Sequence, residues 1–236
     1  MSLIFKNLMR FSILFFTILI LDIVVKETLP IVPYRYLTKP LIVILLIVYY
    51  WFNRSTSKKN FRLLALGALG CFLIGDIFLI RGAFDPIFLA IGVSFFVLGK
   101  AAYCFRFSHS YDFNISRLIP FFIMCFIFMT VMFLLIYDNL GDMFTPILIY
   151  IFVALMMLQL AYLRREAIGV SKESYYMVLI GALITIISDS VTGLKEFYAP
   201  IPFQEIYIML FYGISQYLII VGLVKGETAE LQVAEA

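Results

Sequence analysis

The chain has 236 residues, of which 64% are hydrophobic and only 14% are Asp, Glu, Lys or Arg. A soluble globular protein has roughly 45–50% apolar and about 25% charged residues, so this composition excludes an ordinary soluble domain. The net charge of +3 is small and spread along the chain, and without a long basic run the sequence predicts no binding of nucleic acid.

Eight apolar runs, bounded by charged or turn residues, predict membrane-spanning segments. A span needs roughly 20 apolar residues, and in lipid it must be helical because an unpaired backbone group there costs several kcal/mol. The predicted spans cover residues 8–25, 36–52, 61–80, 86–105, 117–137, 144–163, 174–194 and 203–224. The predicted fold class is therefore all-α, a polytopic membrane bundle of eight transmembrane helices. No room remains for a soluble catalytic domain.

The spans are predicted to form one transmembrane domain over residues 1–226, followed by a polar, acidic tail at 227–236 that we expect to be disordered. The first span is expected to be retained rather than removed as a signal peptide, since it carries Asp22 and ends in Lys26-Glu27 without a small-residue cleavage site. Twelve basic residues lie at the N-terminus, around the even-numbered connections and in the tail, whereas five lie on the opposite side. The positive-inside rule predicts an integral, multi-pass protein with both termini in the cytoplasm.

Cysteine and histidine are too few to indicate a metal site. Cys71, Cys104 and Cys125 lie in apolar runs without CxxC spacing, and we expect them to be packing residues. The single histidine, His109, lies in a polar loop, so a His-rich site cannot be built. The sequence predicts no metal and no cofactor, and it does not indicate an oligomeric state.

A faint internal repeat suggests two four-helix halves. Each half would have a Thr-Pro or Thr-Lys-Pro opening in its second span, an Asp late in its third span and a polar residue followed by Tyr in its fourth. Two halves with an even number of spans each would share one orientation and be related by an axis near the membrane normal. Chance similarity among apolar helices is the alternative. The repeated elements are Thr38-Lys39-Pro40 and Thr145-Pro146, Gly75-Asp76 and Ser188-Asp189, and Lys100…Tyr103 and Gln216-Tyr217.

Ionisable side chains within the spans are the candidate functional residues, because each costs roughly 2.5–3.5 kcal/mol on insertion scales. Asp76 lies deep in the third span, beside a stripe of small residues at Gly67, Cys71 and Gly75 that would let a neighbouring helix approach closely. Asp189 is equally deep in the seventh span. The predicted topology brings both carboxyl groups to a similar depth toward the extracytoplasmic side, so we expect them to share one apolar cavity.

Other polar residues of the spans are further candidates. A small polar stripe that includes Ser188 accompanies Asp189, and Lys39 lies near an interface before Pro40. Lys100, with Tyr103 one turn away, is expected to serve as a counter-ion for a buried carboxylate or as a phosphate contact. A purely structural ion pair of Asp76 with Lys39 or Lys100 is the alternative. Asp22, one turn from the end of its span, is expected to reach interfacial water.

Two carboxyl groups in an apolar pocket suit acid–base chemistry. Burial disfavours the charged form of Asp, and a neighbouring carboxylate disfavours simultaneous ionisation. We therefore expect one carboxyl group to be protonated and the other ionised, the division of roles that such sites use. Motifs of serine hydrolases, zinc proteases, phosphate-binding loops and dinucleotide folds are absent from the sequence.

Five motifs, found in order between about residues 10 and 224, resemble the YhhN-type lysoplasmalogenase family. Members of this family are eight-span membrane proteins that cleave the vinyl-ether bond of lysoplasmalogens. The family usually has His where this chain has Lys100. The motifs are Lys39-Pro40-Leu41, Gly75-Asp76-Ile77-Phe78-Leu79, Gly92…Phe95-Phe96…Gly99…Tyr103, Ser188-Asp189-Ser190 and Tyr212…Gln216.

This resemblance implies a hydrolase whose partners are a lysophospholipid substrate and the lipid of the membrane. Asp76 and Asp189 would be the catalytic acid and base. Two lysines would contact the phosphate or adjust the carboxyl groups, and other polar residues would orient water or the head group. These supporting residues are Lys39, Lys100, Tyr103, Ser188, Tyr212 and Gln216.

Two other functions fit a pair of intramembrane carboxyl groups. A small proton-coupled transporter or a lipid-binding membrane protein could use the same residues, and a duplicated bundle would suit a transporter. An intramembrane aspartyl protease also pairs two Asp residues from different helices. Its GxGD motif would need Gly at the position of Leu73, and no Pro-Ala-Leu sequence occurs.

Overall fold

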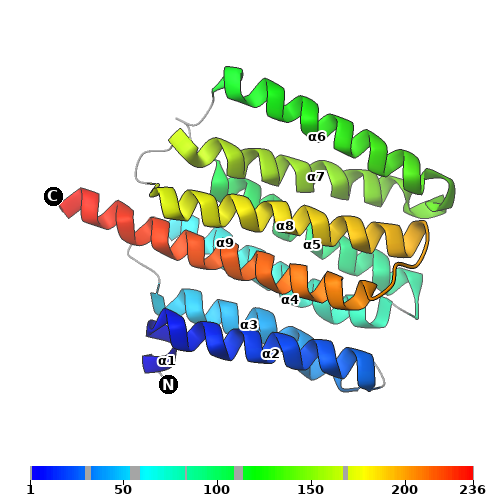
Figure 1. The fold of residues 1–236 in the computed structure, drawn as a ribbon, viewed down its shortest axis with the longest axis horizontal. Coiled ribbons are helices and arrows are strands. Elements are labelled where there is room, and N and C mark those ends of the chain that lie inside the picture. Colours follow the sequence, from blue (N-terminus) through cyan, green and yellow to red (C-terminus); the bar gives the residue numbers. More distant parts are fainter. Residues whose placement is uncertain are drawn as a thin grey trace.

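The computed structural model describes residues 2–29, 33–53, 59–82, 84–108, 114–166 and 170–235 (Figure 1). His109, in the predicted polar loop, lies outside these residues. A short helix α1 (Ser2–Lys6) precedes eight long helices, and 3₁₀ turns flank α7. The long helices are α2 (Leu8–Thr28), α3 (Arg35–Asn53), α4 (Lys59–Gly82), α5 (Pro86–Phe107), α6 (Ile115–Ile136), α7 (Phe144–Leu163), α8 (Lys172–Phe197) and α9 (Gln204–Glu235).

The eight predicted spans are confirmed, since eight helices of the described residues are long and apolar enough to cross a membrane. Polar side chains set several of the helix starts. Asn7, Asp85, Asn114 and Ser171 each occupy the N-cap position, and each side chain accepts a hydrogen bond from a backbone amide of the first turn. These caps satisfy amide groups that the helix itself leaves without a partner.

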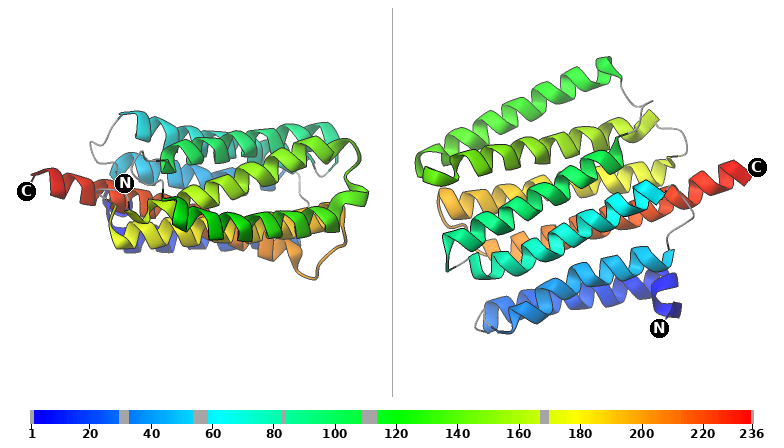
Figure 2. Two further views of the ribbon diagram at one scale, coloured as in Figure 1. Left: turned by 90° about the horizontal axis from the view of Figure 1, so that it is seen from above. Right: turned by 180° about the vertical axis from the view of Figure 1, so that it is seen from behind.

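The long helices pack in chain order within two halves, α2–α5 and α6–α9. Consecutive helices are in contact in both halves, with the most extensive contacts between α4 and α5 and between α8 and α9. Across the halves, α5 packs on α7, and α9 packs on α3 and α2. Figures 1 and 2 show α6 at one edge of the bundle and the α2–α3 pair at the other. Of the eight spans, α9 is the most buried and α6 the least.

Successive long helices run in alternating directions along the bundle. The helices α2, α4, α6 and α8 end where α3, α5, α7 and α9 begin, and both chain termini lie at the other end (Figure 1). We call these the connection end and the terminal end. The outer faces carry many exposed large apolar side chains, such as Leu37, Leu63, Leu134 and Phe152, as expected for surfaces in contact with lipid.

Close helix approach depends on particular glycines rather than on the whole predicted stripe. An added Cβ at Gly75 would lie 2.6 Å from the ring of Phe96, so α4 and α5 meet here as predicted. At Gly67 an added Cβ would meet nothing within 4 Å. Of the two glycines of the stripe, Gly75, the one nearest Asp76, therefore mediates close packing and Gly67 does not.

We expect Gly181→Ala to destabilise the protein by about 1–3 kcal/mol, because the new methyl group forces α8 and α9 apart. A Cβ at this position would lie 2.9 Å from the backbone oxygen of Ser215, which cannot rotate away as a side chain would. Gly67→Ala is the matched control and should be neutral or slightly stabilising, since Ala favours the helix. Unfolding in mixed detergent micelles measures both variants, and equal stability of the two would contradict this account of the α8–α9 contact.

The C-terminal segment differs from the predicted disordered tail. The helix α9 runs on to Glu235, and Glu227, the first residue of that segment, is only 1% exposed. Its Oε1 accepts hydrogen bonds from Tyr50 Oη at 2.6 Å and from Arg106 Nη2 at 3.0 Å. Glu227 thus ties α9 to α3 and α5.

Candidate functional site

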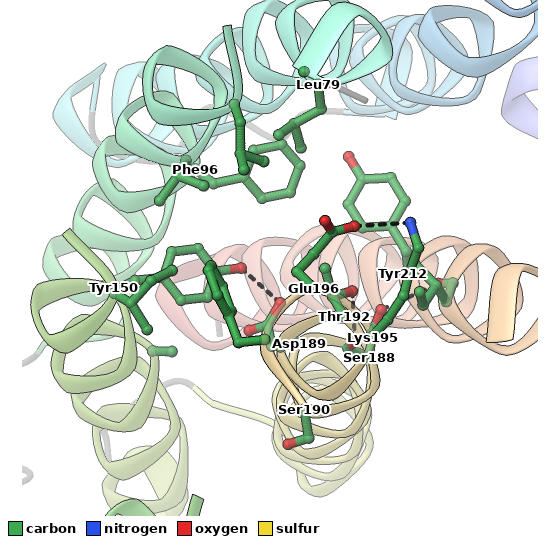
Figure 3. Close-up of a pocket in the computed structure, with 18 of the residues that line it drawn as sticks. Leu79, Phe96, Tyr150, Ser188, Asp189, Ser190, Thr192, Lys195, Glu196 and Tyr212 are labelled. Atoms are coloured by element: carbon green, nitrogen blue, oxygen red, sulfur yellow. Dashed lines mark hydrogen bonds and ion pairs between the residues drawn. The ribbon is translucent and has the colours of Figure 1, made fainter. Parts of the chain in front are cut away.

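A cavity of about 240 Å³ lies between the helices in the half of the bundle nearest the connection end. Its walls are mostly apolar and include Leu79 and Phe96, which lie opposite Asp189 in Figure 3. Seven of the eight spans contribute at least two lining residues each, and α2 adds Lys26. The polar lining residues of the spans include Lys39, Asp76, Tyr150, Ser188, Asp189 and Tyr212.

Asp76 is completely buried and is held by two partners from different helices. Lys39 Nζ on α3 lies 2.9 Å from its Oδ1. Tyr212 Oη on α9 donates a hydrogen bond of 2.8 Å to its Oδ2. We call these three residues the Asp76 cluster. A charge in this position needs such partners, since burial of an unpaired carboxylate is strongly unfavourable.

Asp189 has an analogous environment, which we call the Asp189 cluster. Tyr150 Oη on α7 donates to Asp189 Oδ1 at 2.7 Å, as Figure 3 shows. Lys100 Nζ on α5 lies 3.0 Å from Asp189 Oδ2. Lys100 Nζ also donates to Tyr150 Oη at 2.7 Å, which closes a ring of polar contacts. The Asp189 side chain is 18% exposed, whereas that of Lys100 is 1% exposed. The carboxylate therefore faces the cavity with the ammonium group behind it.

The two clusters occupy corresponding positions in the two halves, with their lysine and tyrosine exchanged. In each half the third helix carries the carboxylate. One partner comes from the second helix of the same half, and the other comes from the fourth helix of the opposite half. The same-half partner is lysine in the Asp76 cluster and tyrosine in the Asp189 cluster. The members are Lys39, Asp76 and Tyr212 in the first, and Tyr150, Asp189 and Lys100 in the second.

Each carboxylate thus has its own ammonium partner. Among the hydrogen bonds of the described residues, none joins Asp76 directly to Asp189, so the site consists of two Lys–Asp pairs facing one cavity rather than two carboxyl groups in contact. In each pair a nitrogen-bound proton lies within hydrogen-bonding distance of a carboxylate oxygen. The arrangement can store two acidic protons and two negative charges in an apolar space.

Most of the predicted site residues gather at this cavity, but Tyr103 and Gln216 do not. Tyr103 Oη donates to Gln216 Oε1 at 3.1 Å, both residues are buried, and neither lines the cavity. They link α5 to α9 farther from the connection end. Ser188 does line the cavity, although its Oγ donates to the backbone oxygen of Ile208 at 3.1 Å.

The structure adds Tyr150 and Arg35, which sequence reasoning missed. Tyr150 could have been found from the repeat, since it stands before Asp189 much as Lys39 stands before Asp76. Arg35 lies just outside the predicted span 36–52, yet it is 7% exposed and lines the cavity. The expectation for Asp22 is wrong: its side chain is fully buried, and it accepts a hydrogen bond from Thr38 Oγ1 at 2.5 Å.

The end of the cavity nearest the connections carries further charges. Lys195 Nζ lies 2.8 Å from Glu196 and 3.0 Å from Glu205, and Lys26 also forms an ion pair with Glu205. These residues come from α2, α8 and α9, so they join three helix ends. In the part of the chain that the structure describes, no three His, Cys, Asp or Glu side chains are arranged to hold a metal ion.

Comparison with known proteins identifies one family. The family model described as the YhhN family matches residues 34–223. The match includes every member of the Asp76 and Asp189 clusters. Neither the curated proteins nor the solved structures include a match to this chain.

Proposed function

The chain belongs to the YhhN family, and we propose that it is a membrane-embedded hydrolase that cleaves the vinyl-ether bond of lysoplasmalogen-type lysophospholipids. The observation that carries this proposal is the cavity, which combines apolar walls with two carboxylates, each paired with a lysine and a tyrosine. Apolar walls suit the alkenyl chain, and the carboxylates suit the chemistry of the ether.

Vinyl-ether hydrolysis begins with transfer of a proton to the alkene carbon that does not bear oxygen. The resulting oxocarbenium ion is captured by water, which loses a proton and gives a hemiacetal. Collapse of the hemiacetal breaks the bond to the glycerol oxygen and releases a fatty aldehyde and a glycerophospho-alcohol. The cation resembles that of glycoside hydrolysis, in which paired carboxyl groups also serve.

The differing exposure of the two carboxylates supports a division of roles. Asp189 faces the cavity with its side chain 18% exposed, so in the proposal its negative charge stabilises the cation and accepts a proton from water. Asp76 is fully buried beside Lys39, which itself lines the cavity. The Lys39–Asp76 pair would supply the proton to the alkene. Lys100 and Tyr150 would hold the Asp189 carboxylate in place.

The side of the membrane follows from the predicted orientation. With both termini in the cytoplasm by the positive-inside rule, the connection end and its cavity would face the extracytoplasmic side. A lysophospholipid would then present its head group at the connection end and its chain toward the apolar walls.

Purified protein in detergent should release a fatty aldehyde from a lysoplasmalogen but leave the saturated ether and the acyl ester of the same head group intact. In D₂O the aldehyde should carry one deuterium on the carbon next to the carbonyl, because that carbon receives the proton. Mass spectrometry after immediate reduction of the aldehyde measures both. Cleavage of the acyl ester at a similar rate, or no product from any of the three lipids, would contradict the proposal.

A transporter is the second candidate, favoured by the two like-oriented halves whose helices contact one another in the same order. In that case the two Lys–Asp pairs would carry protons or bind a charged solute. Proteoliposomes that accumulate the lysolipid without forming aldehyde would favour this function over hydrolysis.

A further inference from the structure

Four basic side chains line the cavity, and three of them are already paired with carboxylates. Lys39 contacts Asp76 at 2.9 Å. Lys195 contacts Glu205 at 3.0 Å, and Lys26 forms an ion pair with the same Glu205. The fourth, Arg35, has only a longer ion pair, with Asp22 at 4.0 Å.

Arg35 is buried but has few contacts for its charge. It is 7% exposed, and the carboxylate oxygen nearest to it in an ion pair is Oδ2 of Asp22, at 4.0 Å. That distance is too long for a hydrogen bond. The other oxygen of Asp22 accepts from Thr38, and the buried Nε of Arg35 has no hydrogen-bond partner. A buried donor without an acceptor costs about 1–3 kcal/mol, a cost that a ligand oxygen would remove.

The position of Arg35 matches the dimensions of a lysophospholipid. It is the first residue of α3, and Lys39 of the Asp76 cluster lies one helical turn farther into the bundle. One turn rises about 5.4 Å, which is close to the separation of the phosphorus from the ether oxygen on the first glycerol carbon. The guanidinium group presents a planar set of donors that fits two phosphate oxygens, and the start of a helix also favours an anion.

We propose that Arg35 binds the phosphodiester of the substrate and so sets how deeply the vinyl ether enters the cavity. This inference rests on the proposed function for the identity of the lipid. It replaces the sequence-based assignment of the phosphate to Lys39 and Lys100, since those two ammonium groups are engaged by Asp76 and Asp189.

A ligand that cannot be cleaved separates binding from chemistry. The probe is an alkyl lysophosphatidylethanolamine with a saturated ether, compared with the alkylglycerol of the same chain in an uncharged detergent. Wild-type protein should bind the phospholipid more tightly, and Arg35→Gln should weaken that binding about 10- to 100-fold while leaving alkylglycerol binding unchanged. Arg81→Gln is the matched control, because Arg81 is an exposed arginine at the same end of the bundle that does not line the cavity.

Further variants keep the test decisive if Arg35→Gln folds poorly. The double variant Asp22→Asn with Arg35→Gln does not leave the Asp22 carboxylate buried without its cation. It should show the same loss of phospholipid affinity as Arg35→Gln alone. Arg35→Lys should recover part of the affinity. Where the wild type is active, KM should rise about 10-fold or more with kcat nearly unchanged.

Competition experiments distinguish a lipid phosphate from a free phosphate ion as the ligand of Arg35. Glycerophosphoethanolamine and inorganic phosphate should compete weakly with the lipid probe; strong competition by inorganic phosphate would mean a site for free anions instead and overturn the lipid assignment. An unchanged preference of Arg35→Gln for the phospholipid would overturn the role of Arg35. Absence of aldehyde from the wild type would overturn the hydrolase alone, because the probe needs no cleavage.

Discussion

Asp189→Asn should lower the rate of aldehyde release about 10²- to 10⁴-fold, the range expected for loss of a catalytic acid–base group. The amide keeps the size of the side chain and can still accept a hydrogen bond from Tyr150, so the cavity should persist. It removes the negative charge that faces the cavity and would stabilise the cation in the proposed reaction. Release of aldehyde from a lysoplasmalogen, followed in detergent by mass spectrometry, measures the effect.

Two controls separate chemistry from folding. Asp138→Asn changes an exposed aspartate at the connection end and should leave activity unchanged. The double variant Asp189→Asn with Lys100→Met removes the ammonium group left behind and should be as inactive as the single variant. If the double variant recovered activity, the unpaired lysine rather than the lost carboxylate would explain the defect. Full activity in Asp189→Asn would remove this residue from the mechanism.

The sequence predicts the eight spans and the two carboxylates because both have large energetic consequences in lipid. A helix must continue until its backbone groups reach water, which makes the apolar runs easy to delimit. An Asp deep in such a run requires a partner, which is why Asp76 and Asp189 are conspicuous without any structure. Equal depth in two helices of the same direction predicts that they could share a cavity, and the packing of the helices brings both to its lining.

The sequence leaves the pairing of these carboxylates open, because the pairing depends on helix packing across the bundle. It offers Lys39 or Lys100 as the partner of Asp76; in the structure Lys39 pairs with Asp76 and Lys100 pairs with Asp189. Tyr150 lies in an apolar run, where a tyrosine is also a common packing residue, so nothing local distinguishes it. Tyr103 and Gln216 are polar residues near the right depth, but they bond to each other away from the cavity. Which polar side chains reach the cavity depends on how each helix is rotated about its axis, and not on the depth of the residue alone.

The exchange of lysine and tyrosine between the two clusters gives the site its asymmetry. A strict repeat would surround both carboxylates identically and could not favour one of them as acid. Here the lysine of the Asp76 cluster lines the cavity, whereas Lys100 lies behind Asp189. The substrate would therefore meet an ammonium group on one side and a carboxylate on the other, an arrangement suited to placing a proton donor opposite a cation stabiliser.

Lys39→Met should destabilise the protein by about 3–5 kcal/mol, because it leaves the buried Asp76 carboxylate without its cation. The hydrogen bond from Tyr212 remains, but a neutral donor cannot replace the charge. The double variant Lys39→Met with Asp76→Asn should recover most of the stability, since no buried charge is then left unpaired. Unfolding in mixed detergent micelles measures the single and double variants alongside the wild type.

Lys225→Met is the matched control, since it breaks an ion pair with Glu173 at the protein surface. Such a pair contributes about 0–1 kcal/mol, so the two lysines should differ by several kcal/mol although both contact a carboxylate. A loss in Lys39→Met that Asp76→Asn does not relieve would show that the lysine matters for packing rather than for charge. Recovery of stability without recovery of aldehyde release would instead show that the same pair stabilises the bundle and is needed for the reaction.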